Sequence, residues 1–131
     1  MKYKNIFITG STGVVGKPLL KKLIENGHEV YALSRSEESK KNLESQGVSV
    51  ISGDILTSNL IDQFQDINID AIFHVAGVNK MCSKNPQYMF DANIDGTKNI
   101  LSLGNDLEIS KFVYTSSAVT LGEDLGSIGN E

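Results

Sequence analysis

The sequence predicts an α/β fold: a doubly wound parallel sheet with strand order 3-2-1-4-5 and helices on both faces. Short β-rich segments alternate with amphipathic segments along the chain, and such alternation is typical of parallel strands joined by right-handed crossovers. The β-rich segments are short and mostly apolar, as expected of strands covered on both faces. A turn with three glycines follows the first of them.

The first strand is expected over residues 5–9, and a helix follows the glycine turn. Apolar residues recur in this helix at helical spacing, namely Val15, Leu19, Leu20, Leu23 and Ile24. Gly27 is the expected C′ residue that ends it. Pro18 must lie near the first turn, because only there does the missing N–H of proline cost nothing.

The alternation continues to the fifth strand. Further strands are expected over 29–33, 48–51, 71–75 and 111–116, and helices over 36–47, 60–64 and 86–103. Ser36, followed by two glutamates, is a predicted N-cap, and Asn85-Pro86 predicts another helix start. These elements assign residues 1–122 to one domain. Residues 123–131 lack periodicity and are expected to form a flexible tail.

Length and composition exclude several classes of function. A chain of 131 residues is long enough for one domain only. The net charge of -4 argues against general nucleic-acid binding. No apolar run approaches the about 18 residues of a membrane span. The single cysteine, Cys82, fits a reducing, cytoplasmic compartment, and two distant histidines predict no metal site.

The segment Thr9–Gly16 follows a strand and opens a helix. In such a loop the first glycine allows a tight turn, the second lets the backbone approach a pyrophosphate, and the third lets the helix pack against the sheet. Free N–H groups and the helix dipole then form an anion site. The alternative is an ordinary strand-helix turn, but the position on the first βα unit favours a Rossmann-type dinucleotide site. Its predicted contacts are Gly10, Ser11, Thr12, Gly13, Val14, Val15 and Gly16.

The end of the second strand should select the cofactor. NAD sites usually carry an Asp or Glu here, which bonds the ribose 2′-hydroxyl. This chain has Ser34 and Arg35 instead, and a guanidinium can bond a 2′-phosphate through two parallel donors. The sequence therefore predicts NADP(H) as the preferred cofactor, with NAD(H) possible. The alternative is that Arg35 stacks on the adenine or lies in solvent.

At this point the sequence resembles the extended short-chain dehydrogenase/reductase family, which includes sugar-nucleotide epimerases, dehydratases and dihydroflavonol-type reductases. The resemblance runs from Lys4 to about Gly122 and rests on five motifs in order. They are Thr9–Gly16, Gly53-Asp54-Ile55, His74-Val75-Ala76-Gly77, Asn93-x-x-Gly96-Thr97 and Thr115-Ser116-Ser117-Ala118.

The resemblance implies a role for each motif. Asp54, beside Ile55, would bond the adenine amine; the alternative is that this aspartate caps a turn. The backbone of Val75, Ala76 and Gly77 would lie along the cofactor, with Asn79 nearby, while His74 is interpreted as a packed strand residue. Ser117 would hydrogen-bond the reacting oxygen of the substrate, and serine at a strand's end is also common in loops. The remaining implied cofactor contacts are Thr115, Ser116 and Asn93.

Asn93 has two open interpretations. It falls on one helical face with Met89, Gly96, Ile100 and Leu103. That face is otherwise apolar, so a buried amide there needs a partner. In the resembling family such an asparagine holds a bent helix or an active-site water. A satisfied structural amide is the alternative.

One departure from the family pattern is large. The family's acid/base pair is Tyr-x-x-x-Lys after the fifth-strand serine, whereas the tyrosines here are Tyr3, Tyr31, Tyr88 and Tyr114. The chain is therefore expected to be the cofactor-binding half of an NADP(H)-dependent oxidoreductase, epimerase or dehydratase, truncated after the fifth strand and lacking its substrate domain. Its substrate would be a hydroxyl or carbonyl compound such as a nucleotide sugar. The alternative is a non-catalytic NAD(P)-binding sensor or partner-binding module.

The fifth strand would then be an unprotected sheet edge, which is a template for pairing with another chain. We therefore expect a homo-oligomer.

Overall fold

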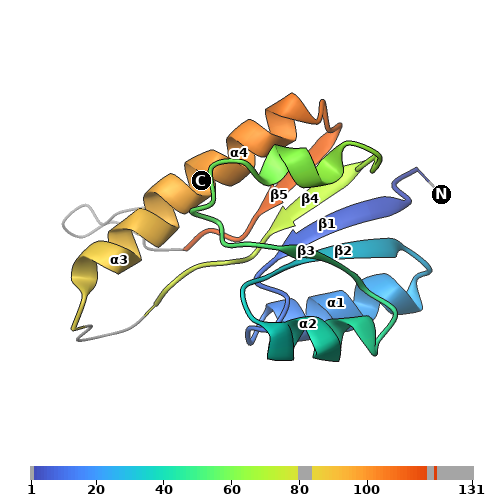
Figure 1. The fold of residues 1–131 in the computed structure, drawn as a ribbon, viewed down its shortest axis with the longest axis horizontal. Helices are drawn as coiled ribbons and strands as arrows, with labels where there is room; N and C mark the ends of the chain where they lie inside the picture. The colour runs from blue at the N-terminus through green and yellow to red at the C-terminus, as the bar shows by residue number, and fades with distance from the viewer. Residues whose placement is uncertain (1, 80–83, 118–119, 121–131) are drawn as a thin grey trace, which may run out of the picture.

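The computed structural model describes residues 2–79, 84–117 and 120. Five parallel strands form one sheet with the order β3-β2-β1-β4-β5, as predicted (Figure 1). Their bounds are β1 Asn5–Thr9, β2 Glu29–Ser34, β3 Ser49–Ser52, β4 Ala71–His74 and β5 Lys111–Tyr114. In the register, Ile6 of β1 lies opposite Val30 of β2 on one side and Ala71 of β4 on the other.

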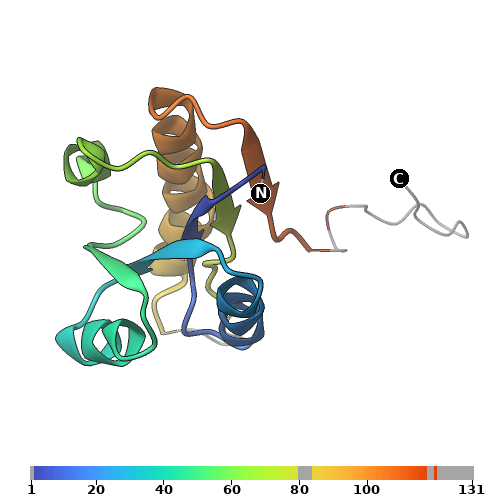
Figure 2. The same cartoon turned by 90° about the vertical axis from the view of Figure 1, so that its right-hand side faces the viewer.

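Helices cover both faces of the sheet, as Figure 2 shows. Helices α1 (Gly16–Glu25) and α2 (Glu37–Glu44) lie on one face. The 3-10 helix η1 (Leu60–Phe64) and the long helix lie on the other; the latter consists of α3 (Pro86–Phe90), η2 (Asp91–Asp95) and α4 (Gly96–Asp106).

Successive side chains of β1 point to opposite faces of the sheet, so they pack into two separate core clusters. Ile6 and Ile8 pack in a cluster with Leu20 and Leu43 of the first pair of helices. Phe7 points to the other face, where it packs in a second cluster. The helical members of that cluster are Leu60, Phe64, Ile100 and Leu103.

The predicted helix boundaries are confirmed where the signal is local. Gly27 follows the C-cap of α1 with φ +79°, and the N–H of His28 bonds the carbonyl of Leu23. The Ser36 side chain accepts from the N–H of Ser39 at 3.2 Å and caps α2. One detail is wrong: Val15 precedes α1 and is 54% exposed, so the apolar stripe of this helix begins after it.

The helix predicted over 86–103 is not one regular α-helix. Residues 91–95 form a π-helical turn, η2, and α4 continues to Asp106. The Thr97 hydroxyl donates to the Asn93 carbonyl at 2.8 Å, so a side chain takes up a backbone acceptor at the turn. Such turns often lie at functional sites.

Within the described ranges, no helix is both long and apolar enough to cross a membrane. Cys82 and the tail predicted over 123–131 lie outside the described residues.

Candidate functional site

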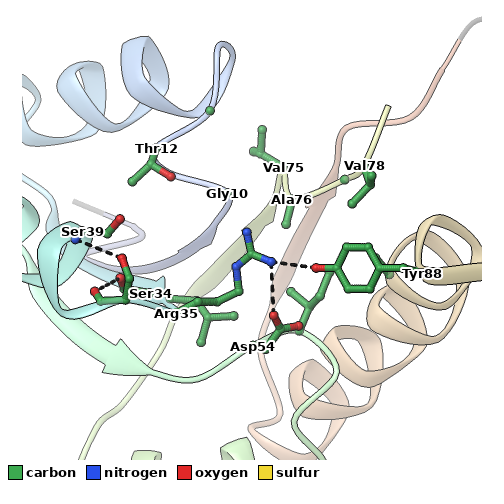
Figure 3. A pocket seen from close by; sticks show the side chains of 16 residues that line it. Gly10, Thr12, Ser34, Arg35, Ser39, Asp54, Val75, Ala76, Val78 and Tyr88 are labelled. Atoms are coloured by element: carbon green, nitrogen blue, oxygen red, sulfur yellow. Dashed lines mark hydrogen bonds and ion pairs between the residues drawn. The ribbon is translucent and has the colours of Figure 1, made fainter. Parts of the chain in front are cut away.

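A cavity of about 580 Å³ opens at the carboxyl ends of β1, β2, β3 and β4. Strand order reverses between β1 and β4, and ligands of open α/β sheets bind at such a switch point. Many predicted residues line the cavity (Figure 3). They are Gly10, Thr12 and Gly13 of the glycine loop, Ser34 and Arg35 after β2, Asp54 and Ile55 after β3, and Val75, Ala76 and Gly77 after β4.

Other predicted residues lie outside the cavity lining. Within the glycine loop, Ser11 and Gly16 are buried, whereas Val14 and Val15 are exposed. Asn79 is exposed and Asn93 is partly buried. Thr115, Ser116 and Ser117 follow β5 and are exposed. The N–H of Thr115 bonds the carbonyl of His74 at 3.0 Å, which keeps this segment beside the end of β4.

The glycine loop is shaped by close backbone contacts. Gly10 has φ +73°, and a Cβ there would lie 2.6 Å from the backbone nitrogen of Ala76. A Cβ on Gly16 would overlap the carbonyl oxygen of Gly10. Gly13 is less crowded, since among the described residues its Cβ would meet that same carbonyl oxygen alone, in a tight contact at 3.3 Å. Two glycines therefore shape the loop, while the third leaves the cavity open.

We call residues 75–78 the inner wall of the cavity. A buried chain of hydrogen bonds holds its base at β4. Thr9 Oγ1 lies 2.7 Å from His74 Nδ1, and His74 Nε2 lies 3.0 Å from Thr97 Oγ1. The N–H of Ala76 donates to Thr9 Oγ1 at 3.2 Å. His74 is fully buried, and its ring stacks on Tyr114 with centroids 5.5 Å apart.

The direction of this chain assigns the histidine tautomer. Thr97 gives its single proton to the Asn93 carbonyl, so its oxygen must accept from His74 Nε2–H. Nδ1 is then the acceptor of the Thr9 proton. Burial lowers the pKa of His74 to about 4, because the charged ring would be desolvated. His74 is therefore a neutral, packed strand residue, as predicted.

Asn93 holds the other end of the inner wall. Its Oδ1 accepts from the N–H of Val78 at 2.8 Å, and its Nδ2 donates to the Val78 carbonyl at 2.9 Å. Both ends of the amide are satisfied, which is the structural-amide alternative. Asn93 thus shapes the cavity through Val78 rather than by lining it.

We call Arg35, Asp54 and Tyr88 the outer rim. Nη1 of Arg35 donates to the Tyr88 hydroxyl at 2.7 Å and lies 3.4 Å from Asp54 Oδ2 (Figure 3). The other carboxylate oxygen of Asp54 accepts from the N–H of Leu56 at 3.0 Å. Asp54 therefore caps its turn with one oxygen and faces Arg35 with the other.

Sequence reasoning missed part of the lining, namely Leu33, Ser36, Ser39, Val78, Tyr88 and Ala92. Leu33, Ser36 and Val78 adjoin predicted residues, and a wider window would have included them. Tyr88 has no such signal, because it lies far along the chain from its partner Arg35.

This arrangement, with a glycine loop at the switch point of a parallel sheet, defines a Rossmann-type nucleotide-binding domain. The pattern of the NAD dependent epimerase/dehydratase family matches residues 6–131. The chain belongs to this family, whose members depend on NAD(P).

Individual proteins are similar to this chain in sequence or in fold. The chain is 31% identical to sterol-4-alpha-carboxylate 3-dehydrogenase, decarboxylating, of Dictyostelium discoideum, over 95% of this chain and 39% of the relative. A solved UDP-glucose 4-epimerase matches with TM-score 0.77 and 25% identity, over 92% of this chain and 37% of that one. A Bordetella bronchiseptica enzyme in complex with NAD+ matches with TM-score 0.74 and 23% identity, over 91% and 40%. The chain spans about a third of the length of the curated relatives it matches.

Proposed function

We propose that this chain is the NADP(H)-binding part of an oxidoreductase, epimerase or dehydratase that acts on a hydroxyl or carbonyl substrate such as a nucleotide sugar. The cofactor preference rests on the residues at the end of β2. Arg35 lines the cavity there, and the neighbouring Ser34 hydroxyl is bonded to the Ser36 carbonyl at 3.2 Å. No carboxylate stands where an NAD site would hold one.

The charge on Arg35 is available to a phosphate. Both hydrogen bonds that Arg35 makes to described residues use Nη1, so toward this part of the chain Nη2 and Nε remain as donors. Figure 3 shows the guanidinium extending from the end of β2 into the cavity, between Gly10 and Asp54. A hydrogen bond to a charged group contributes about 1.5–3 kcal/mol. Because the Arg35 side chain is 67% exposed, we expect the lower value, which corresponds to roughly a tenfold preference for NADPH over NADH.

Ser117 is our proposed contact for the reacting substrate oxygen. It follows the strand beside β4, at the same edge of the sheet as the cavity. A nicotinamide lying along residues 75–78 would extend toward this segment. Hydride would then move between the cofactor and the substrate carbon that bears that oxygen.

Titration calorimetry with NADPH and NADH tests the cofactor assignment. The wild-type chain should bind NADPH about tenfold more tightly, and Arg35→Ala should narrow the gap by lowering affinity for NADPH alone. Equal affinities, or tighter NADH binding, would refute the NADP(H) preference.

A second variant tests whether the glycine loop holds the pyrophosphate. Gly13→Val should abolish binding of both dinucleotides, because a branched side chain would occupy the pyrophosphate position. The fold should remain largely intact, since a Cβ at Gly13 is tight against one described backbone atom, the Gly10 carbonyl oxygen at 3.3 Å, which needs to shift by only a few tenths of an ångström. Unchanged circular dichroism together with unchanged affinity would make the loop a simple turn.

We also propose that the chain self-associates through β5. Among the described strands, β5 pairs with β4 only, and Tyr114 on it is 48% exposed. The N–H of Thr115 points to β4, so that of Tyr114 points to the open edge. Unpaired edges of this kind invite pairing with another chain.

Sedimentation equilibrium over a concentration series tests this proposal. Tyr114→Pro should weaken association more than Leu101→Lys, which changes an exposed position of α4. Ile100, although on the predicted helical face, is fully buried and is unsuitable as a surface variant. A clean monomer at high micromolar concentration would contradict the proposal.

A further inference from the structure

We propose that Tyr88 is a cofactor-selecting residue: its hydroxyl holds the Arg35 guanidinium in the orientation that receives the 2′-phosphate of NADP(H). This assignment rests on the proposed function, which it extends to a residue that no sequence motif marks. Tyr88 is therefore a positioning residue, acting on the cofactor through Arg35.

The position of Tyr88 is set by its own helix. The N–H of Tyr88 donates to Asn85 Oδ1 at 3.2 Å, and Pro86 begins α3. The turn η2, which follows α3, is tied to the inner wall through Asn93 and Val78. Tyr88 thus enters the cavity from the side opposite β2, with its hydroxyl directed at Arg35 (Figure 3).

Of the two contacts to Nη1, the one to Tyr88 is the better orienting bond. It is 2.7 Å long, within the usual hydrogen-bond range, whereas the Asp54 contact is 3.4 Å. The Arg35 side chain is 67% exposed, and exposed ion pairs contribute little. Without Tyr88, a long side chain with considerable rotamer freedom would be free to leave the cavity.

The chemistry of a phenol suits this task. Tyr88 accepts a hydrogen bond from Arg35 without adding a second negative charge to that of Asp54, so it does not further offset the positive charge that attracts a phosphate. A carboxylate in the same place would orient Arg35 equally well but would repel a 2′-phosphate. Holding the arginine in advance also lowers the entropy lost when the phosphate binds.

A double-mutant cycle on the chain tests the assignment, with NADPH and NADH as probes in titration calorimetry. Tyr88→Phe keeps the ring and removes the hydroxyl. It should weaken NADPH binding about three- to tenfold, the cost of immobilising one long side chain, and leave NADH binding within twofold. In the Arg35→Ala background the same substitution should have no effect on either dinucleotide.

Tyr31→Phe is the matched control, because it removes a phenol hydroxyl from β2 that lies outside the cavity lining. It should leave both affinities unchanged.

Several results would overturn the assignment. Equal weakening of NADPH and NADH by Tyr88→Phe would mean that the hydroxyl shapes the cavity in general. An effect that persists with Arg35→Ala would mean direct contact with the cofactor. An unaltered NADPH affinity, in a chain whose preference still depends on Arg35, would overturn the role of Tyr88 alone. A wild-type chain that binds neither dinucleotide would refute the proposed function, and the assignment with it.

Discussion

The two sides of the cavity are built differently. The inner wall is backbone, held by buried side chains: Thr9 and His74 beneath Ala76, and Asn93 on both polar groups of Val78. The outer rim is a set of side chains that meet in partly exposed positions, with Arg35 itself 67% exposed. Buried polar networks are costly to disturb, whereas exposed ion pairs are not. The inner wall is thus preformed, and the outer rim is the side at which a cofactor can be selected at little cost in stability.

The largest expected effect is at the contact between the glycine loop and the inner wall. Gly10→Ala would place a Cβ 2.6 Å from the backbone nitrogen of Ala76, at φ +73°. The left-handed backbone costs about 1–2 kcal/mol, and the overlap adds about 1–3 kcal/mol. We expect the free energy of unfolding in urea to fall by roughly 3 kcal/mol or more.

Gly47→Ala is a matched control for that substitution. Gly47 has φ +80°, and a Cβ there meets no atom of the described residues within 4 Å. The free energy of unfolding of Gly47→Ala should therefore fall only by the cost of the left-handed backbone, about 1–2 kcal/mol. Equal losses in the two variants would mean that the loop moves away from Ala76 freely, and the inner wall would not be rigid.

The next largest effect is a pH dependence of the free energy of unfolding, which comes from His74. The pKa of His74 is lowered to about 4 in the fold, while an unfolded histidine titrates near ~6.5. Between these two values the unfolded chain binds the extra proton, so stability rises with pH across this window. This contribution is fully present above about pH 6.5. It should fall by about 3 kcal/mol as the pH drops to about 4.

Urea unfolding at a series of pH values measures this term. His74→Asn should remove it, whereas His28→Asn should keep it, because His28 lies at the other end of the sheet, bonded to the Tyr3 carbonyl. If the wild type and His74→Asn show parallel pH profiles, the histidine is not held neutral, and the hydrogen-bond direction assigned here is wrong.

The inner wall and the outer rim also differ in how far the sequence alone could predict them. The caps at Ser36 and Asn85 and the glycine loop follow from residues a few positions apart. The strand order follows from the alternation of strands and helices along the chain. Asn93 could be predicted to need a partner, but the partner, Val78, depends on how η2 sits against β4. The π turn itself has no hydrophobic period that differs from that of an α-helix.

The contacts of the outer rim were the hardest part of the site to predict from the sequence. Arg35 was expected to face either a phosphate, the adenine or solvent, and none of these includes the Tyr88 hydroxyl. That contact joins residues 53 positions apart in the sequence. The contact forms because α3 lies across the cavity from the end of β2. That placement depends on the packing of the whole domain.

The smallest expected effect is at the outer rim. Asp54→Asn keeps the oxygen that caps the turn at Leu56 and removes the charge that faces Arg35. An exposed pair of this kind contributes about 0.2–1 kcal/mol, so the free energy of unfolding should fall by no more than about 1 kcal/mol. Urea unfolding at low salt and at about 1 M salt separates the terms, because screening removes the ion pair but leaves the cap. The difference between wild type and variant should therefore vanish at high salt. A loss of about 2 kcal/mol or more that survives high salt would exceed what an exposed pair supplies. The outer rim would then contribute to the stability of the fold as the inner wall does. Changing its contacts when a cofactor binds would then cost considerable free energy.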